Sequence, residues 1–289
     1  MTETELKTLL SGITPPDEAA RAAAHAHWAG LAKPLGGLGA LETLLEDAAA
    51  LTGSAALDVS RRAVLVLCSD NGVVAQGVSQ TDQSVTRAVA ENLAARRTSV
   101  CQMARTAHCD VVPVDMGMAG DPVPGVADCR IAAGTADFTQ GPAMTRAQAV
   151  EAVGRGILRN EPDPTDPLDV LAKLGGFDLA GLCGVFLGGA LEGVPVVMDG
   201  FISGVAALCA VRLCPAAAKA VFASHCSSEP AARLVLDALG KAPLLTAGLH
   251  LGEGTGAVAS LPLWDMALAV YDHCYSFAEG GITPYTPQC

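Results

Sequence analysis

The chain has 289 residues, of which 51% are hydrophobic and 17% charged, and its mean hydropathy is +0.37. This length and composition allow a sizeable buried core, so disorder is not the default expectation. The net charge of −12 and the low pI disfavour nucleic acid as a partner. The apolar stretch 181–200 is interrupted by Glu192, Asp199 and several glycines, so we predict no membrane span. The N-terminus lacks the basic and apolar regions of a signal peptide, so we expect a cytoplasmic protein.

Cysteine and histidine spacing indicates no metal centre. The chain contains 10 cysteines but no Cys-x-x-Cys pair, so we interpret the cysteines as reduced and mostly as small core residues. His25 and His27 are two positions apart on a predicted helix and cannot share a face, which argues against a shared metal ion. We expect neither a metal nor a cofactor.

Residues 1–60 have the pattern of a helical layer, with predicted helices over 2–10, 17–31 and 40–51. Beyond Arg62 the pattern changes to short strands that alternate with helices. The predicted strands cover 63–68, 110–114, 194–198 and 220–223. Such alternation predicts an α/β fold, a mostly parallel sheet with helices on both faces. In such sheets ligands bind beyond the carboxyl ends of the strands.

The segment Leu249–Ala257, Leu-His-Leu-Gly-Glu-Gly-Thr-Gly-Ala, places one carboxylate between glycines that allow a ligand close to the backbone. Apolar neighbours such as Leu251 would desolvate Glu253 and raise its pKa, which suits a general base. The alternative is a Gly-rich turn in which Glu253 is merely solvated. The glycine spacing matches neither the dinucleotide fingerprint nor a Walker loop.

Three prolines in residues 160–167 exclude a helix there, so the helix that begins near Thr145 is expected to end at about Arg159. Helix and strand signals resume at Leu168. We therefore expect a rigid loop inside one domain and no interdomain linker.

Several sequence blocks in fixed order resemble the nicotinate-nucleotide:dimethylbenzimidazole phosphoribosyltransferase family of cobalamin lower-ligand assembly. The blocks are 33–39 (Lys-Pro-Leu-Gly-Gly-Leu-Gly), 70–73 (Asp-Asn-Gly-Val), 164–173, 199–203 (Asp-Gly-Phe-Ile-Ser) and 251–257. The similarity runs from about Lys33 to Tyr271.

This resemblance implies a Rossmann-like parallel sheet and a smaller helical domain built from both chain ends. We accordingly expect residues 1–60 with 256–289 to form the helical domain and residues 61–255 the sheet domain. The resemblance also implies a homodimer with active sites near the subunit interface.

The family reaction is attack of an aromatic base on C1′ of nicotinate mononucleotide, with release of nicotinate and inversion at C1′. By resemblance, Glu253 is the catalytic residue that takes the proton of the attacking nitrogen. Ser227, Gly252 and the neighbouring Leu251 match the nucleotide site, and Lys173 matches a lysine near the phosphate. Thr81 and Val89 match the wall of the base pocket. Taken without the family, Lys173 is a solvated helix-end lysine and Ser227 a helix cap.

The chain also differs from the family pattern. Between the helix near Ile157 and the Pro-rich loop, family members carry several dozen further residues, including a Gly-x-x-Asn-Thr-Thr turn that cradles the nucleotide phosphate. A shortened member without that turn should bind the nucleotide weakly. Asn71 replaces a usual histidine, and Thr81 and Val89 replace a serine and a glutamine. The alternative reading is a catalytically impaired partner subunit that forms a heterodimer with a longer paralogue.

Overall fold

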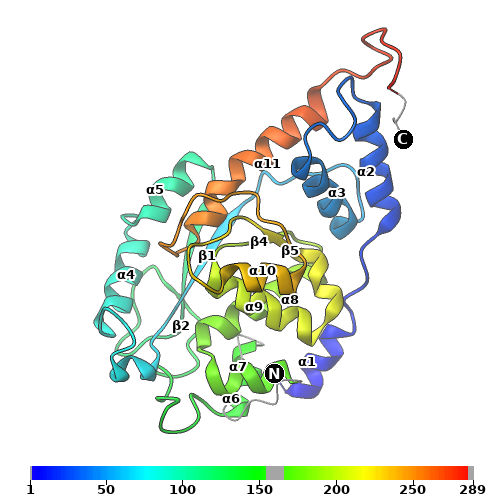
Figure 1. Ribbon diagram of the computed structural model, residues 1–289. Coiled ribbons are helices and arrows are strands. Elements are labelled where there is room, and N and C mark those ends of the chain that lie inside the picture. The colour runs from blue at the N-terminus through cyan, green and yellow to red at the C-terminus, as the bar shows by residue number, and fades with distance from the viewer. Residues whose placement is uncertain (1, 154–165, 286–289) are drawn as a thin grey trace.

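The computed structural model describes residues 2–153 and 166–285 (Figure 1). Its helices and strands follow in the order α1 (Glu3–Leu10), α2 (Glu18–Gly30), α3 (Ala40–Thr52), β1 (Ala63–Ser69), η1 (Gly72–Gln76), α4 (Ser84–Ala94), α5 (Ser99–Thr106), β2 (Asp110–Gly117), β3 (Ala127–Asp128), α6 (Arg146–Val153), α7 (Pro167–Leu174), α8 (Phe177–Glu192), β4 (Val196–Met198), α9 (Phe201–Leu213), η2 (Pro215–Ala220), β5 (Val221–Ala223), α10 (Ala232–Leu239) and α11 (Thr255–His273). The structure confirms the α/β class and the helices expected over 2–10, 17–31 and 40–51.

The strands of the described ranges, β1 to β5, pair in parallel, as the alternating pattern predicts. Strand β1 pairs with β2, and β2 with β3, while β4 pairs with β5. The strands form two hydrogen-bonded sheets, β1-β2-β3 and β4-β5, where the sequence suggested one. The second sheet is short because β4 and β5 each have three residues before a polar turn begins.

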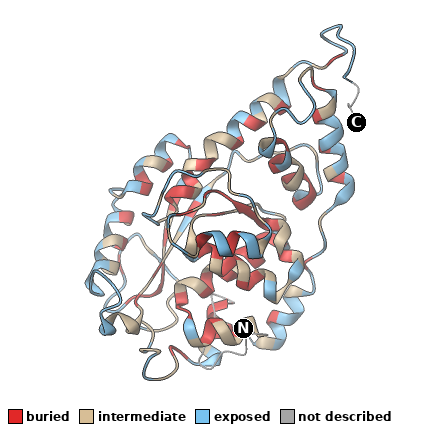
Figure 2. Ribbon diagram, viewed as in Figure 1, coloured by how far each residue is buried: buried red, intermediate tan, exposed pale blue. Residues whose placement is uncertain are grey.

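The β1-β2 sheet is covered on both faces, which explains its apolar strands. Val64 and Cys68 on β1 join a core with the inner sides of α4 and α5, such as Leu93 and Val100. Met116 on β2 faces the other way, into a larger core with residues of α8 and α9. Figure 2 shows the buried residues gathered on the strands and on the helix faces around them.

Both chain ends contribute helices to one region. Trp28 of α2 packs edge-on against Tyr271 of α11 at a ring distance of 4.9 Å, and α2 packs against α3. By contrast α1 lies near α6 and α7 (Figure 1), where Arg146 forms an ion pair with Glu3 at 3.1 Å. The division into a helical domain of 1–60 with 256–289 and a sheet domain of 61–255 stays a prediction.

Helix α6 begins with a reciprocal cap. The Gln148 side chain accepts a hydrogen bond from the Thr145 N–H at 2.8 Å, and the Thr145 hydroxyl accepts one from the Gln148 N–H at 3.1 Å. Its expected end near Arg159 and most of the Pro-rich loop lie outside the described residues. Asp166 then caps α7 by accepting a hydrogen bond from the Leu168 N–H at 2.9 Å. In the described ranges, no helix combines the length and the apolar character that a membrane crossing requires.

Candidate active site

Glu253 lies in a short loop of unusual backbone geometry directly before α11. Gly252, Glu253 and Gly254 all adopt left-handed backbone, with φ of +83°, +58° and +82°. A left-handed φ costs a residue with a side chain about 1 kcal/mol, so it persists only where the surroundings hold it. A Cβ on Gly254 would lie 2.3 Å from a methyl carbon of Val64 on β1, so only glycine fits there. The loop is therefore pressed against the sheet.

Two side chains at the carboxyl ends of β4 and β5 fix the start of α11. Asp199 accepts hydrogen bonds from the N–H groups of Gly256 at 2.7 Å and Ala257 at 3.0 Å. The ring of His225 lies on Gly256, where a Cβ would come within 2.0 Å of it. The Glu253 loop thus meets the carboxyl end of the β4-β5 sheet, the place where a parallel sheet is expected to bind ligands.

The Glu253 carboxylate is partly buried next to the N-terminus of α5. Its Oε2 atom is buried and has no hydrogen-bond partner. Burial raises the pKa of Glu253 and outweighs a smaller lowering effect of the nearby Thr98 side chain and Val100 backbone. A carboxylate with a raised pKa and an unused oxygen is suited to accept a proton near neutral pH.

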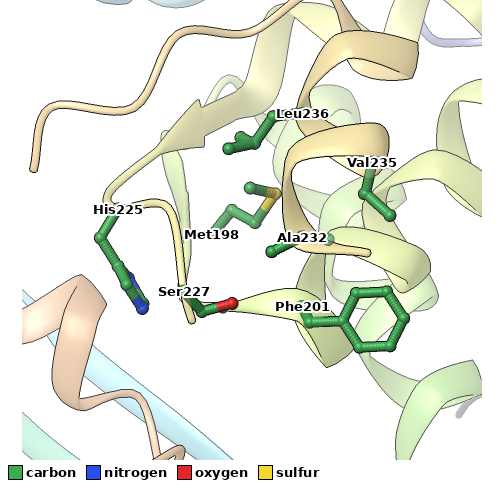
Figure 3. Close-up of a pocket in the computed structure, with 9 residues that line it drawn as sticks. Met198, Phe201, His225, Ser227, Ala232, Val235 and Leu236 are labelled. Atoms are coloured by element: carbon green, nitrogen blue, oxygen red, sulfur yellow. The ribbon is translucent and has the colours of Figure 1, made fainter. Parts of the chain in front are cut away.

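Ser227 lies in the loop after β5, which runs beside the Glu253 segment because the Ser228 N–H bonds the Leu249 carbonyl at 3.1 Å. The Ser227 side chain is buried and lines a small cavity with Phe201 and His225 (Figure 3). Figure 3 shows the Ser227 hydroxyl on the side of Phe201. Ser227 also lowers the pKa of the nearby Glu229 carboxyl.

The side chain of Lys173 is held in an ion pair in this structure. Its ammonium pairs with Asp169, one turn earlier on α7, at 2.6 Å, and both side chains are largely buried. The positive charge of Lys173 is therefore balanced by the Asp169 carboxylate on the same helix. A phosphate would have to compete with Asp169 for it.

The remaining predicted residues lie around the loop and α4. Leu251 is 55% exposed, and Gly252 beside it is also exposed. Thr81 is exposed in the turn before α4, and Val89 on α4 is half-buried against the core next to β1. Gln83 donates to the Asn71 carbonyl at 3.3 Å, which joins the start of α4 to the turn after β1.

Sequence reasoning missed a group of carboxylates around Cys68, near the carboxyl end of β1. Burial, together with charge repulsion from Asp115, Asp178, Glu253 and Asp70, raises the pKa of Cys68 to about 12. The polar turns after β1 and β2 gave a signal for Asp70 and Asp115. Asp178 gave none, because it lies in the first turn of an apolar helix.

Asp178 is a buried carboxylate with one unused oxygen. Its Oδ1 atom has no hydrogen-bond partner, and burial raises its pKa against a smaller lowering effect of the Leu179 and Asp178 backbone N–H groups and of Asn71. A raised pKa and an unused oxygen make Asp178 a second potential proton or hydrogen-bond acceptor near the site. Within residues 2–153 and 166–285, no group of three or more His, Cys, Asp or Glu side chains could hold a metal ion.

Comparison with known proteins gives a consistent result. A family model described as Phosphoribosyltransferase matches residues 13–159 and 150–282. The nicotinate-nucleotide–dimethylbenzimidazole phosphoribosyltransferase of Acetivibrio thermocellus is 34% identical over 324 residues, covering 89% of this chain and 92% of the relative. The enzyme of the same name from Salmonella agona is 34% identical over 343 residues, covering 96% of both.

Solved structures agree with these relatives. The crystal structure of CobT from Thermus thermophilus matches with a TM-score of 0.84 at 31% identity, covering 92% of this chain and 99% of the other. A structure of nicotinate-nucleotide–dimethylbenzimidazole phosphoribosyltransferase from the same organism matches with a TM-score of 0.85 at 32% identity and the same coverage.

The chain belongs to the phosphoribosyltransferase family. The relatives that it matches over nearly their whole length are enzymes named for nicotinate nucleotide and dimethylbenzimidazole, so the family resemblance found in the sequence is confirmed. The alternative of an impaired subunit in a heterodimer receives no support from these relatives.

Proposed function

We propose that this protein transfers the phosphoribosyl group of nicotinate mononucleotide to an aromatic lower-ligand base, dimethylbenzimidazole or a close relative, in cobalamin biosynthesis. The names of its relatives support the substrates. The observation that carries the proposal is the Glu253 carboxylate, whose Oε2 atom is buried and unpartnered in a loop at the carboxyl end of a parallel sheet.

The chemistry requires one proton acceptor. A ring nitrogen of the base attacks C1′ and forms the new C–N bond, while the bond to the nicotinate nitrogen breaks and leaves its electron pair on nicotinate. Attack opposite the leaving group inverts C1′ and gives an α-linked ribotide. Glu253 accepts the proton that the base loses. Its raised pKa keeps the proton affinity of the carboxylate closer to that of the reacting base.

The remaining site residues take binding roles. Ser227, Gly252 and Leu251 contact the nucleotide from the two loops that run side by side. Thr81 and Val89 form the wall of the base pocket at the start of α4 and along it. Lys173 contacts the phosphate only after its ion pair with Asp169 breaks. The loss of that ion pair reduces the binding free energy that the phosphate contact contributes.

The phosphate site is the weakest part of this arrangement. The alignment to the Salmonella agona enzyme spans 343 positions, more than the 289 residues of the chain, which supports a missing segment in this protein. We propose that the missing segment includes the phosphate-cradling turn. A cation alone replaces backbone N–H donors poorly, so nucleotide affinity is low.

The functional unit is proposed to be a homodimer. Leu174, Ile202 and Leu234 are 55%, 53% and 69% exposed on α7, α9 and α10, and α9 packs against both other helices. Exposed apolar side chains on neighbouring helices are typical of a subunit interface.

Product analysis tests the proposed function. Purified protein incubated with nicotinate mononucleotide and dimethylbenzimidazole should release nicotinate and form the ribotide in equal amounts. Absence of ribotide at millimolar nucleotide with dimethylbenzimidazole, and with a series of related aromatic bases, would contradict it. Nicotinate release without ribotide would indicate hydrolysis instead of transfer.

A further inference from the structure

The His225 side chain projects from the loop after β5 (Figure 3) and packs against the beginnings of two helices. The residue is only 3% exposed. Its Cε1 atom lies 3.6 Å from the position that a Cβ on Gly200, directly before α9, would take. Its Cε1 and Nδ1 atoms both lie 2.0 Å from the position of a Cβ on Gly256, in the first turn of α11. The ring therefore fills the space that any side chain at position 256 would need.

Hydrogen bonds fix the orientation of this ring. The Ser224 hydroxyl is fully buried and donates to the Met198 carbonyl at 2.5 Å. A hydroxyl has a single proton, so we assign the contact of 3.0 Å between Ser224 and His225 to donation by the Nδ1–H of the ring. The backbone is held as well, because Leu245 donates to the Ser224 carbonyl at 2.9 Å and accepts from the Cys226 N–H at 3.0 Å. The ring is thus anchored to the β4-β5 sheet through both its side chain and its backbone.

We infer that His225 is a positioning residue for Glu253: its ring fixes the place of Gly256 against the β4-β5 sheet, and with it the loop that carries the carboxylate. This inference rests on the proposed function, because it assigns Glu253 the proton transfer. It extends that proposal to a residue that neither the glycine-rich pattern nor the relatives' names indicate.

The loop needs such a support because its own backbone restrains it poorly. Glu253 lies between two glycines, and all three residues have left-handed backbone. Gly254 packs against Val64 of β1 and Gly256 against the His225 ring, so the segment rests on both sheets. Close packing on both sheets resists displacement of the loop. Displacing a catalytic group by about 1 Å costs up to about 10²-fold in rate, so the position of Gly256 matters for the proton transfer.

The test is a double-mutant cycle. Gly256→Ala places a methyl group where the ring lies, and His225→Ala removes the ring. Either change alone should lower kcat by roughly 10- to 100-fold, because each displaces the loop. Without the ring the methyl group fits, so adding Gly256→Ala to His225→Ala should lower kcat further by less than about twofold. Gly188→Ala, on α8, has no neighbour within 4 Å of its Cβ and should leave kcat unchanged, as should His25→Ala, whose exposed ring pairs with Glu46.

A second readout does not depend on turnover. In protein labelled with ¹³C at the glutamate carboxyl groups, the Glu253 signal is identified by its loss in Glu253→Gln. Its titration midpoint should lie above the usual glutamate pKa in the wild type, because burial raises the pKa of Glu253. In Gly256→Ala and in His225→Ala the midpoint should fall toward the usual value, because a displaced carboxylate meets more water.

The outcomes separate the inference from the proposed function. Midpoints that fall in both single variants, without ribotide formation by any protein, would leave the inference standing and overturn the proposed function. If Gly256→Ala alone does not fold, adding His225→Ala should restore a folded protein. An equal cost of Gly256→Ala with and without the ring, a fold that His225→Ala fails to restore, or unchanged midpoints in both single variants would overturn the inference.

Discussion

At Asp178 the fold buries a carboxylate whose Oδ1 atom has no partner, and burial raises its pKa. The folded state therefore holds the proton more tightly than the unfolded state does. Stability falls as pH rises from the ordinary aspartate pKa through the raised one, because folding then has to bury the charge. At neutral pH the buried Asp178 carboxylate lowers the free energy of unfolding, and such a perturbed pKa is typical of functional sites.

Replacing Asp178 by Asn should consequently stabilise the protein at neutral pH, since the amide keeps the size of the side chain and removes the buried charge. Urea unfolding at several pH values measures this. The variant should unfold at higher urea than the wild type at pH 7, and the difference should shrink toward acid pH. Asp82→Asn is the control of opposite sign, because hydrogen bonds from Ser84 lower the pKa of the exposed Asp82. Equal midpoints at every pH would contradict the assignment of Asp178 as a buried charge.

Lys173 tests the proposed phosphate contact. If its ammonium reaches the phosphate, Lys173→Ala should weaken nicotinate mononucleotide binding about tenfold, the range of a charged hydrogen bond. Titration calorimetry measures the change. Lys219→Ala serves as the control, because Lys219 bonds Thr14 at 3.2 Å on the surface. Micromolar affinity in the wild-type protein would show that binding does not need the phosphate-cradling turn that we propose is missing, and equal affinity in Lys173→Ala would remove Lys173 from the proposed site.

At the scale of elements, α11 and the Glu253 loop depend on Asp199. Asp199→Ala removes the acceptor for two N–H groups at the start of α11 and should destabilise the protein by about 1 to 2 kcal/mol. Asp199→Asn should avoid much of this loss, since an amide oxygen still caps. Chemical denaturation gives both values. Asp272→Ala, at the opposite end of the same helix, should be neutral or slightly stabilising because a negative charge is unfavourable there. A similar loss in both alanine variants would argue against the cap.

The sequence predicts the elements well because their signals are local. Caps such as Asp17 and the Thr145–Gln148 pair, and the apolar runs of β1 and β2, mark helices and strands without knowledge of the partners. The split into two sheets was not predicted, since strand pairing depends on contacts between distant segments. For the same reason the position of α1 beside α6, where Arg146 pairs with Glu3, was not predicted.

The candidate site was predictable only in part. The flanking glycines indicated Glu253 as a candidate catalytic residue, and the family resemblance indicated Ser227 and Lys173 as candidate binding residues. Neither route could reveal that Lys173 pairs with Asp169, or that a Cβ at Gly254 would collide with Val64 on β1. Those relations are set by three-dimensional packing.

For the whole molecule, the proposed homodimer gives a test of assembly. Light scattering at micromolar concentration should report a dimer. Leu234→Glu should yield a folded monomer, because this side chain is 69% exposed and contributes little to the core of its own chain. Met266→Glu, 57% exposed on α11, should leave the dimer intact. A wild-type protein that is monomeric under these conditions would rule out the homodimer and an interface formed by α7, α9 and α10.

Glu253→Gln tests the central claim that this chain supplies the base of a phosphoribosyl transfer. The substitution keeps the size and hydrogen bonding of the side chain and removes its ability to accept the proton. Nicotinate mononucleotide binding, measured by calorimetry, should be unchanged, and ribotide formation should fall by about 10²-fold or more. Glu192→Gln, exposed at the end of α8, should retain full activity. Ribotide formation by Glu253→Gln at the wild-type rate would contradict the account.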